Sequence, residues 1–209
     1  MTITYLIIGF TVLISIAAFN NPDIMYKGRH WPYAEARRGE YHRWLTSGFL
    51  HGDYMHLLFN MITLYFFGES VELWFDVLFP GVGKTLFLFF YLISIVAASL
   101  ATFYKYKDVQ HFASIGASGA VSAVLFAAIL LNPTMELGFM FLQGISIPGF
   151  IYGAFYLWYS SYAARRGGDG IDHTAHFYGA VFGFLFPLVL KPILISSFVM
   201  QLSDWLTSW

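Results

Sequence analysis

Ser118 is the side chain whose surroundings first suggest chemistry. It lies in the run Gly116-Ala117-Ser118-Gly119, which opens a long apolar segment and sets one hydroxyl between glycines. His176, at the start of a later apolar segment, is the candidate partner, because histidine is the usual base that activates a serine. The two residues are far apart in the chain, so the elements that carry them must bring them together.

Two stripes of small residues could supply that contact. In the segment of Ser118, small residues recur four apart, at Gly119, Ala123 and Ala127. In the later segment, Gly179 and Gly183 follow His176 at i+3 and i+7 and lie on one helical face with it. Small residues let two membrane helices pack backbone to backbone. We therefore expect the two helices to pack closely, with His176 beside Ser118.

Hydrogen-bond donors are available for the charge that an attack by Ser118 would create. His56 and Asn60 are four residues apart, so they share one face of a helix. The backbone amides of Ala117 and Ser118 belong to a first helical turn, where an α-helix supplies no partners. Donors aimed at a developing oxyanion form an oxyanion hole. We predict that these four groups line one around Ser118.

Each of these signals also has a purely structural interpretation. Small residues are common in helix packing, and an asparagine in a membrane helix often bonds to a neighbouring helix. A histidine at a helix start is often bonded to a carbonyl, and Ser122 is interpreted as a packing residue. The combination favours chemistry, because the polar groups cluster near one end of three apolar segments.

The composition places these segments in a membrane. Hydrophobic residues make up 58% of the 209 residues and charged residues 11%, whereas soluble domains carry about 25% charged residues. Backbone groups in a bilayer must be paired within helices or closed barrels, and long apolar runs favour helices. The absence of cysteine excludes disulfides and thiol catalysis, and a net charge of -1 without a basic block argues against nucleic acid.

The expected fold is an all-α polytopic membrane protein with six transmembrane helices in one bundle. The spans are expected at about 2–20, 53–74, 85–104, 114–131, 149–164 and 172–190. The first is interpreted as a span, because it lacks the charged flank and cleavage site of a signal peptide. Residues 1–192 would form one membrane domain, and the tail 193–209 an amphipathic helix at the membrane interface.

Two connections between the spans are distinctive. Residues 21–52 combine aromatic and cationic side chains, a combination typical of the membrane interface. Residues 134–148 contain Gly138, Gly144 and Pro148, which argue against a continuous helix. We expect this second connection to be extended or irregular and to lie at the membrane edge.

Three motifs, in this order, resemble the rhomboid family of intramembrane serine proteases. His51, His56 and Asn60 match the pattern His-x4-His-x3-Asn of the second span. Gly116-Ala117-Ser118-Gly119 looks like the nucleophile motif, and the run 175–183 looks like Ala-His-x2-Gly-x3-Gly of the sixth span. The similarity covers about residues 1–192.

The resemblance implies a six-helix rhomboid-like bundle with a catalytic dyad of Ser118 and His176. His56, Asn60 and the Ser118 amide would line the oxyanion hole. The activity would be acyl transfer through Ser118, which cleaves a peptide bond in or near a transmembrane segment of a membrane-protein substrate, without cofactor or metal. Residues 21–52 would be partly embedded in the membrane, and the fifth span with its flanking segment would control substrate entry from the lipid.

Neighbouring polar residues are not expected to join the dyad. The family has no aspartate that orients the histidine, so Asp172 is interpreted as the N-cap of the sixth span. His173 lacks the glycines at i+3 and i+7 and does not match the motif. Many relatives carry an aromatic residue one turn after the serine, where this chain has Ser122.

Two indicators of orientation conflict. The resemblance to bacterial members places the Ser118 end of the bundle on the extracytoplasmic side of a bacterial inner membrane. Nine of the 11 Lys and Arg residues lie in the loops at that end, from which the positive-inside rule predicts the reverse. The resemblance gives the orientation that we expect.

The sequence leaves two other functions open. Four histidines could hold a metal ion or a haem: His51, His56, His173 and His176. Asp172-His173-x2-His176 has the spacing of metal ligands, but a metal site would leave Asn60 and the serine motif unexplained. The other alternative is a non-catalytic relative that binds membrane clients, which ranks lower because Ser118 and His176 are both present.

Overall fold

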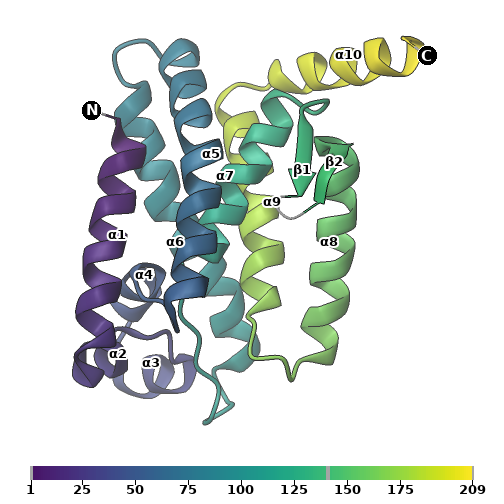
Figure 1. Cartoon of the computed structure of the whole chain (residues 1–209). Coiled ribbons are helices and arrows are strands. Elements are labelled where there is room, and N and C mark those ends of the chain that lie inside the picture. The colour runs from purple at the N-terminus through teal and green to yellow at the C-terminus, as the bar shows by residue number, and fades with distance from the viewer. Residues whose placement is uncertain (1, 140–141, 209) are drawn as a thin grey trace.

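The computed structural model describes residues 2–139 and 142–208. Within them, six long helices form one bundle: α1 (Ile3–Phe19), α5 (Tyr54–Leu78), α6 (Gly83–Tyr106), α7 (Ser118–Leu131), α8 (Gly149–Arg166) and α9 (His173–Leu190) (Figure 1). Each of the six apolar segments is thus a helix. Large apolar side chains such as Leu13 and Val189, which are 71% and 78% exposed, cover the outside of the bundle. A surface of this kind is suited to lipid contact.

The helices differ in whether each one alone is long and apolar enough to cross a membrane. Among the described residues, α6 and α9 are each long and apolar enough to cross one, with mean hydropathies of 2.3 and 1.3. α1 qualifies only together with the following α2 (Pro22–Gly28), to which it is bent by 119°. α7 is apolar but has 14 residues. It rises about 21 Å, less than the roughly 30 Å of a hydrocarbon core.

α7 is the central helix of the bundle. Every one of its residues after Ser118 is buried, as expected for a helix that is apolar all round. α9 packs on its small residues. A Cβ atom on Gly179 would overlap the Gly119 carbonyl, and one on Gly183 would overlap the Ala123 carbonyl. The predicted backbone-to-backbone contact of the two stripes is confirmed.

α7 begins four residues later than expected, because the chain before it is held in another conformation. Ser114 exchanges two backbone hydrogen bonds with His30, at 3.0 and 2.9 Å, as an isolated antiparallel bridge. Gly116 has a φ of 132°, which disfavours any residue with a side chain. The start of α7 at Ser118, together with its short length, sets the serine inward from the end of the bundle.

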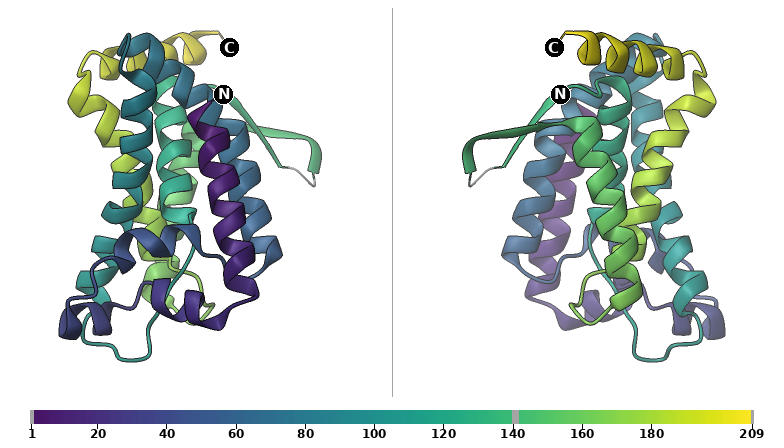
Figure 2. Two further views of the ribbon diagram at one scale, coloured as in Figure 1. Left: turned by 90° about the vertical axis from the view of Figure 1, so that its left-hand side faces the viewer. Right: turned by 90° about the vertical axis from the view of Figure 1, so that its right-hand side faces the viewer.

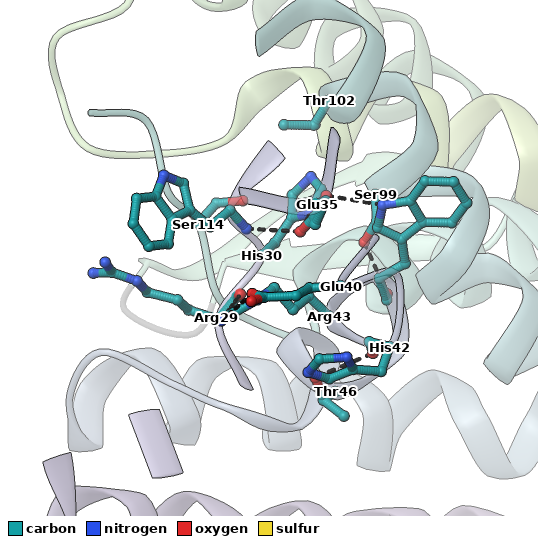
Figure 3. Close-up of polar contacts among 12 residues, drawn as sticks. Arg29, His30, Glu35, Glu40, His42, Arg43, Thr46, Ser99, Thr102 and Ser114 are labelled. Carbon is teal, nitrogen blue, oxygen red and sulfur yellow. Dashed lines mark hydrogen bonds and ion pairs between the residues drawn. The ribbon is translucent and has the colours of Figure 1, made fainter. Parts of the chain in front are cut away.

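The first loop is folded into short helices. Besides α2 it contains α3 (Pro32–Arg38), α4 (Arg43–Thr46) and the 3₁₀ turn η1 (Ser47–Phe49). The buried Glu35 carboxylate binds His30 Nδ1 at 2.8 Å and accepts hydrogen bonds from the indole of Trp44 and the backbone N–H of Trp31 (Figure 3). Arg43 donates to Glu40, which lowers the pKa of that carboxyl. These bonds connect the short helices to one another.

A β-hairpin joins α7 to α8. β1 (Glu136–Phe139) pairs antiparallel with β2 (Leu142–Pro148), and the hairpin projects from the bundle (Figure 2). The expectation of an extended connection is confirmed outside residues 140–141, which are not among the described residues. Because the hairpin follows the C-terminus of α7, it lies at the end opposite Ser118. α10 (Leu194–Thr207) crosses the same end (Figure 1), where Phe198 packs on Phe184 with ring centroids 5.4 Å apart.

Candidate active site

Ser118 and His176 are brought together at the N-termini of α7 and α9. The distance from Ser118 Oγ to His176 Nε2 is 2.8 Å. That distance is within the range in which a general base takes a proton. For Ser118 to donate this hydrogen bond, the imidazole must carry its own proton on Nδ1.

Asp172 anchors the start of α9, and its carboxylate bonds to groups other than the His176 ring. Its carboxylate accepts the Ala175 N–H at 2.9 Å, which confirms the predicted N-cap. It also accepts hydrogen bonds from Thr102 in α6, at 3.0 Å, and from Ser114, at 2.9 Å. Asp172 therefore fixes α9 against α6 and against the segment that leads to Ser118.

His173 lies close to His176 but has a different partner. Its Nε2 is 2.8 Å from the Asp169 carboxylate, and this hydrogen bond lowers the pKa of Asp169. The two histidine rings meet edge to face, with centroids 5.6 Å apart. Within the described part of the chain, no carboxylate is hydrogen-bonded to the His176 ring. The orientation of that ring therefore depends on packing.

His56 reaches the same place from α5. Asp53 caps α5 by accepting the His56 N–H at 2.8 Å. A Cβ atom on Gly116 would lie 2.8 Å from His56 Nε2 and 3.6 Å from Ser118 Oγ, so the glycine lets the imidazole approach the serine. His56 Nδ1 accepts a long hydrogen bond from the Gly52 N–H, at 3.4 Å. In that tautomer, Nε2 carries the proton and is a donor on the side of Ser118.

Asn60 lies one turn further along α5 and is 7% exposed. Its side-chain amide donates to the His56 carbonyl at 2.9 Å. A primary amide has a second N–H, which this bond leaves available. Asn60 thus follows His56 on one helix face, as the spacing predicts.

His51 contributes to the site through a backbone amide that its motif did not indicate. Its Nε2 accepts the Ala117 N–H at 3.4 Å, and its Nδ1 lies 2.9 Å from Ser15 Oγ in α1. Ser15 in turn donates to the Phe49 carbonyl at 2.9 Å. The Ala117 amide, one of the predicted oxyanion donors, is therefore engaged by His51. In the sequence, His51 stands out as the first histidine of the second-span motif, but the motif does not indicate which groups it bonds to.

The aromatic ring beside His176 comes from α8. Tyr156 lies nearly parallel to the imidazole, with ring centroids 6.4 Å apart and an interplanar angle of 30°. Its hydroxyl is 2.5 Å from Ser122 Oγ, and Ser122 donates to the Ser118 carbonyl at 2.7 Å. Ser122 is thus more than a packing residue. No pattern in the sequence indicated Tyr156, because its helix is connected to α7 by a long hairpin.

The histidines considered as metal ligands have separate partners. Within residues 2–139 and 142–208, no three His, Asp or Glu side chains converge in an arrangement that could hold a metal ion. His173 and His176 direct their Nε2 atoms to Asp169 and Ser118, respectively.

The fold and the site define a class of protein, a multi-helix membrane protein whose buried central helix begins with a serine bonded to a histidine. Residues 38–193 match the family model of the Rhomboid domain. The chain belongs to the rhomboid family and is a multi-pass membrane protein.

Curated relatives from bacteria and mitochondria are similar to it. The rhomboid protease GlpG of Haemophilus influenzae is 31% identical over 198 residues, which cover 90% of each chain. RHOMBOID-like protein 12, mitochondrial, of Arabidopsis thaliana is 30% identical over 69% of this chain and 45% of its own length. Rhomboid protein 1, mitochondrial, of Saccharomyces cerevisiae is 32% identical over 68% of this chain and 40% of its own length. This chain therefore spans less than half the length of the two mitochondrial relatives.

Proposed function

We propose that this protein is an intramembrane serine endopeptidase that cleaves membrane proteins through an acyl-enzyme on Ser118. The observation that carries the proposal is the 2.8 Å contact between Ser118 Oγ and His176 Nε2 at the recessed start of α7. A hydroxyl in contact with an imidazole is the arrangement that makes serine a nucleophile. Membership of the rhomboid family supports the same reaction class.

In the first half of the reaction, Ser118 Oγ attacks the carbonyl carbon of the scissile peptide bond while His176 Nε2 takes the hydroxyl proton. The carbonyl oxygen becomes an oxyanion. His176 then gives its proton to the leaving amine, the C–N bond breaks, and an ester on Ser118 remains. In the second half, His176 takes a proton from water, which attacks the ester. The acid product leaves, and the proton returns to Ser118.

The oxyanion would be stabilised by donors around Ser118. His56 Nε2 lies across Gly116 from the serine, and the Ser118 N–H belongs to the unpaired first turn of α7. Asn60 and the Ala117 amide are the further candidates, although the Ala117 N–H is shared with His51. Loss of one such donor costs about 10²- to 10³-fold in kcat in a comparable serine protease.

The substrates would be proteins with a transmembrane segment. A peptide bond within a helix has a hydrogen-bonded and shielded carbonyl, so the segment must unwind before it can reach Ser118. Segments with helix-destabilising residues near the scissile bond are therefore favoured. Entry from the lipid past α8 agrees with the exposed apolar surface of that helix, for example Trp158, which is 60% exposed.

We propose the bacterial inner membrane as the location, with the Ser118 end on the extracytoplasmic side. The similarity to the bacterial relative over 90% of both chains supports this assignment. Residues 1–192 are proposed as the catalytic membrane domain. The tail 193–209, which contains α10, is proposed to lie at the membrane interface, and the apolar Val199 and Met200 on its exposed face suit this position.

The decisive experiment compares dyad variants in a reconstituted cleavage assay with a transmembrane substrate. Ser118→Ala and His176→Ala are each expected to lower cleavage about a thousandfold or more, because the first removes the nucleophile and the second removes the base that activates it. Ser196→Ala and His111→Ala, at exposed positions, are the matched controls and should cleave at the wild-type rate. Wild-type cleavage by either dyad variant would refute the assignment.

A fluorophosphonate probe gives an independent measurement on the folded protein. The wild type should be labelled at Ser118, and the His176→Ala variant should not. A folded wild-type protein that is neither labelled nor active would instead support the non-catalytic client-binding alternative.

A further inference from the structure

We propose that Tyr156 is a positioning residue for the Ser118–His176 pair, so that catalysis requires α8 to be seated against α7 and α9. The inference rests on the proposed function of that pair. It adds a condition that the dyad alone does not contain, because Tyr156 belongs to a peripheral helix.

The first support is the packing of the His176 ring. Tyr156 lies nearly parallel to the imidazole, at 6.4 Å between centroids, and His173 meets it edge to face, at 5.6 Å. In the described residues, no carboxylate bonds to this imidazole to fix its plane. Besides the hydrogen bond to Ser118, these two rings hold the imidazole in place, and of the two rings Tyr156 comes from outside α9.

The second support is a chain of hydroxyl groups that leads from α8 to the nucleophile. Ser122 Oγ donates to the Ser118 carbonyl at 2.7 Å, so its single proton is committed. The Tyr156 hydroxyl, 2.5 Å away, must then be the donor to Ser122. Through this chain, α8 contacts the residue that carries the nucleophile as well as the one that carries the base.

The third support is the position of α8 at the edge of the bundle, beside α9 (Figure 1). Its outer face exposes large side chains such as Phe155, at 59%, while its inner face is narrow and includes Gly153 against Phe126 and Ile129. The loop after it contains Gly167, at a φ of 62°, with open space around it. A displacement of α8 would remove the Tyr156 ring and hydroxyl from the site together.

The consequence is a coupling between α8 and the chemistry. When α8 moves outward, His176 loses one ring neighbour and the Ser118 carbonyl loses its link to α8. Turnover therefore requires α8 to return after the substrate has entered. If α8 only obstructed the entry of substrate, its displacement would leave Ser118 reactive.

The test separates reactivity from entry with a small fluorophosphonate probe and with the kcat and KM of a transmembrane substrate. Tyr156→Leu removes the ring and hydroxyl, and Tyr156→Phe and Ser122→Ala remove the hydroxyl link. Phe155→Leu removes an aromatic ring from the outer face of the same helix and is the matched control. Thermal unfolding of each variant verifies folding.

We expect Tyr156→Leu to lower the labelling rate and kcat about tenfold, with KM within about twofold of wild type, because an aromatic contact of this kind carries roughly that factor. Tyr156→Phe and Ser122→Ala should each lower both rates about threefold, the effect of a modest hydrogen bond. Phe155→Leu should change neither rate.

Wild-type labelling and kcat in a folded Tyr156→Leu protein would overturn the proposal, and so would an equal decrease in Phe155→Leu. If Tyr156→Leu does not fold, the two hydroxyl variants decide, and wild-type rates in both refute it. Failure of the wild-type protein itself to be labelled or to cleave would instead refute the proposed function.

Discussion

At the scale of a single residue, the hydrogen bonds of the buried His51 imidazole depend on which ring nitrogen carries the proton. Its Nε2 accepts the Ala117 N–H and its Nδ1 faces Ser15 Oγ, while Ser15 gives its own proton to the Phe49 carbonyl. All three contacts fit a neutral ring that is protonated on Nδ1. Burial, aided by the neighbouring His56, lowers the pKa of His51 to about 3. The ring therefore stays neutral in the folded protein at any moderately acidic pH.

This lowered pKa predicts a pH-dependent stability. In the unfolded chain His51 takes up a proton below about pH 6.5, whereas in the folded protein it does not. The unfolded state then binds more protons, so the free energy of unfolding falls as the pH decreases, by up to about 1.4 kcal/mol per pH unit between about 6.5 and 3. Thermal unfolding in detergent should show a smaller decrease from pH 7 to pH 5 for His51→Gln than for wild type.

The control is His111→Gln, at an exposed loop position, which should lose stability as the wild type does. Equal decreases in all three proteins would contradict the assignment of this pH dependence to His51.

At the scale of elements, the contact between α7 and α9 determines whether Ser118 and His176 meet. The two helices approach so closely that the glycines of α9 face backbone carbonyls of α7. An α-helical side chain points back toward the N-terminus of its helix, so a close approach near Gly179 and Gly183 fixes the spacing at the helix starts as well. The glycine stripe therefore sets the separation of Ser118 and His176 in addition to packing the two helices.

Gly183→Ala tests this role of the stripe at a distance from Ser118 and His176. The added methyl group would overlap the Ala123 carbonyl, and the helices must separate. We expect a loss of about 2 kcal/mol or more in the free energy of unfolding, as for overpacking in a tight core, together with reduced cleavage. Unfolding by denaturing detergent and the cleavage assay measure the two effects.

Gly9→Ala in α1 is the matched control, because nothing lies within 4 Å of the added Cβ atom. Its helix should gain up to about 1 kcal/mol from the better propensity of alanine. Similar stability of the two variants would show that the stripe does not hold α7 and α9 together.

At the scale of the whole molecule, the bundle has two dissimilar ends. The first loop, with its short helices and buried Glu35, lies at the Ser118 end, while the hairpin and α10 lie at the other (Figures 1 and 2). Several cations at the Ser118 end have partners in the fold. Arg43 is bonded to Glu40, and Lys105 donates to the Ala164 carbonyl at 2.6 Å.

The proposed orientation predicts the outcome of reporter fusions. A fluorescent protein that folds only in the cytoplasm, fused after Trp209, should be fluorescent in bacterial cells. A phosphatase that is active only outside the cytoplasm should be active when inserted at Gly168, in the open loop near the Ser118 end. The reverse pattern would show that the excess of cations at this end decides the orientation, as the positive-inside rule states.

Much of the fold was predictable from the sequence, because it depends on local properties. Apolar runs and the Pro and Gly residues between them located all six helices to within a few residues. Asp172 was identified as a cap with the help of its place at the start of the sixth apolar segment, and the periodicity of small residues predicted the contact of α7 with α9. The pairing of Ser118 with His176 followed from these regularities, since two stripes that pack align the residues at their starts.

Contacts without a periodic signal required the tertiary structure. The start of α7 shifted because Ser114 bonds to His30 in the first loop. The Ala117 amide is shared with His51, and the ring beside His176 comes from Tyr156. The sequence by itself thus determined which residues could react and which helices carry them. Only the tertiary structure decided what holds them in place, because those contacts join remote side chains whose spacing along the chain follows no helical or strand period.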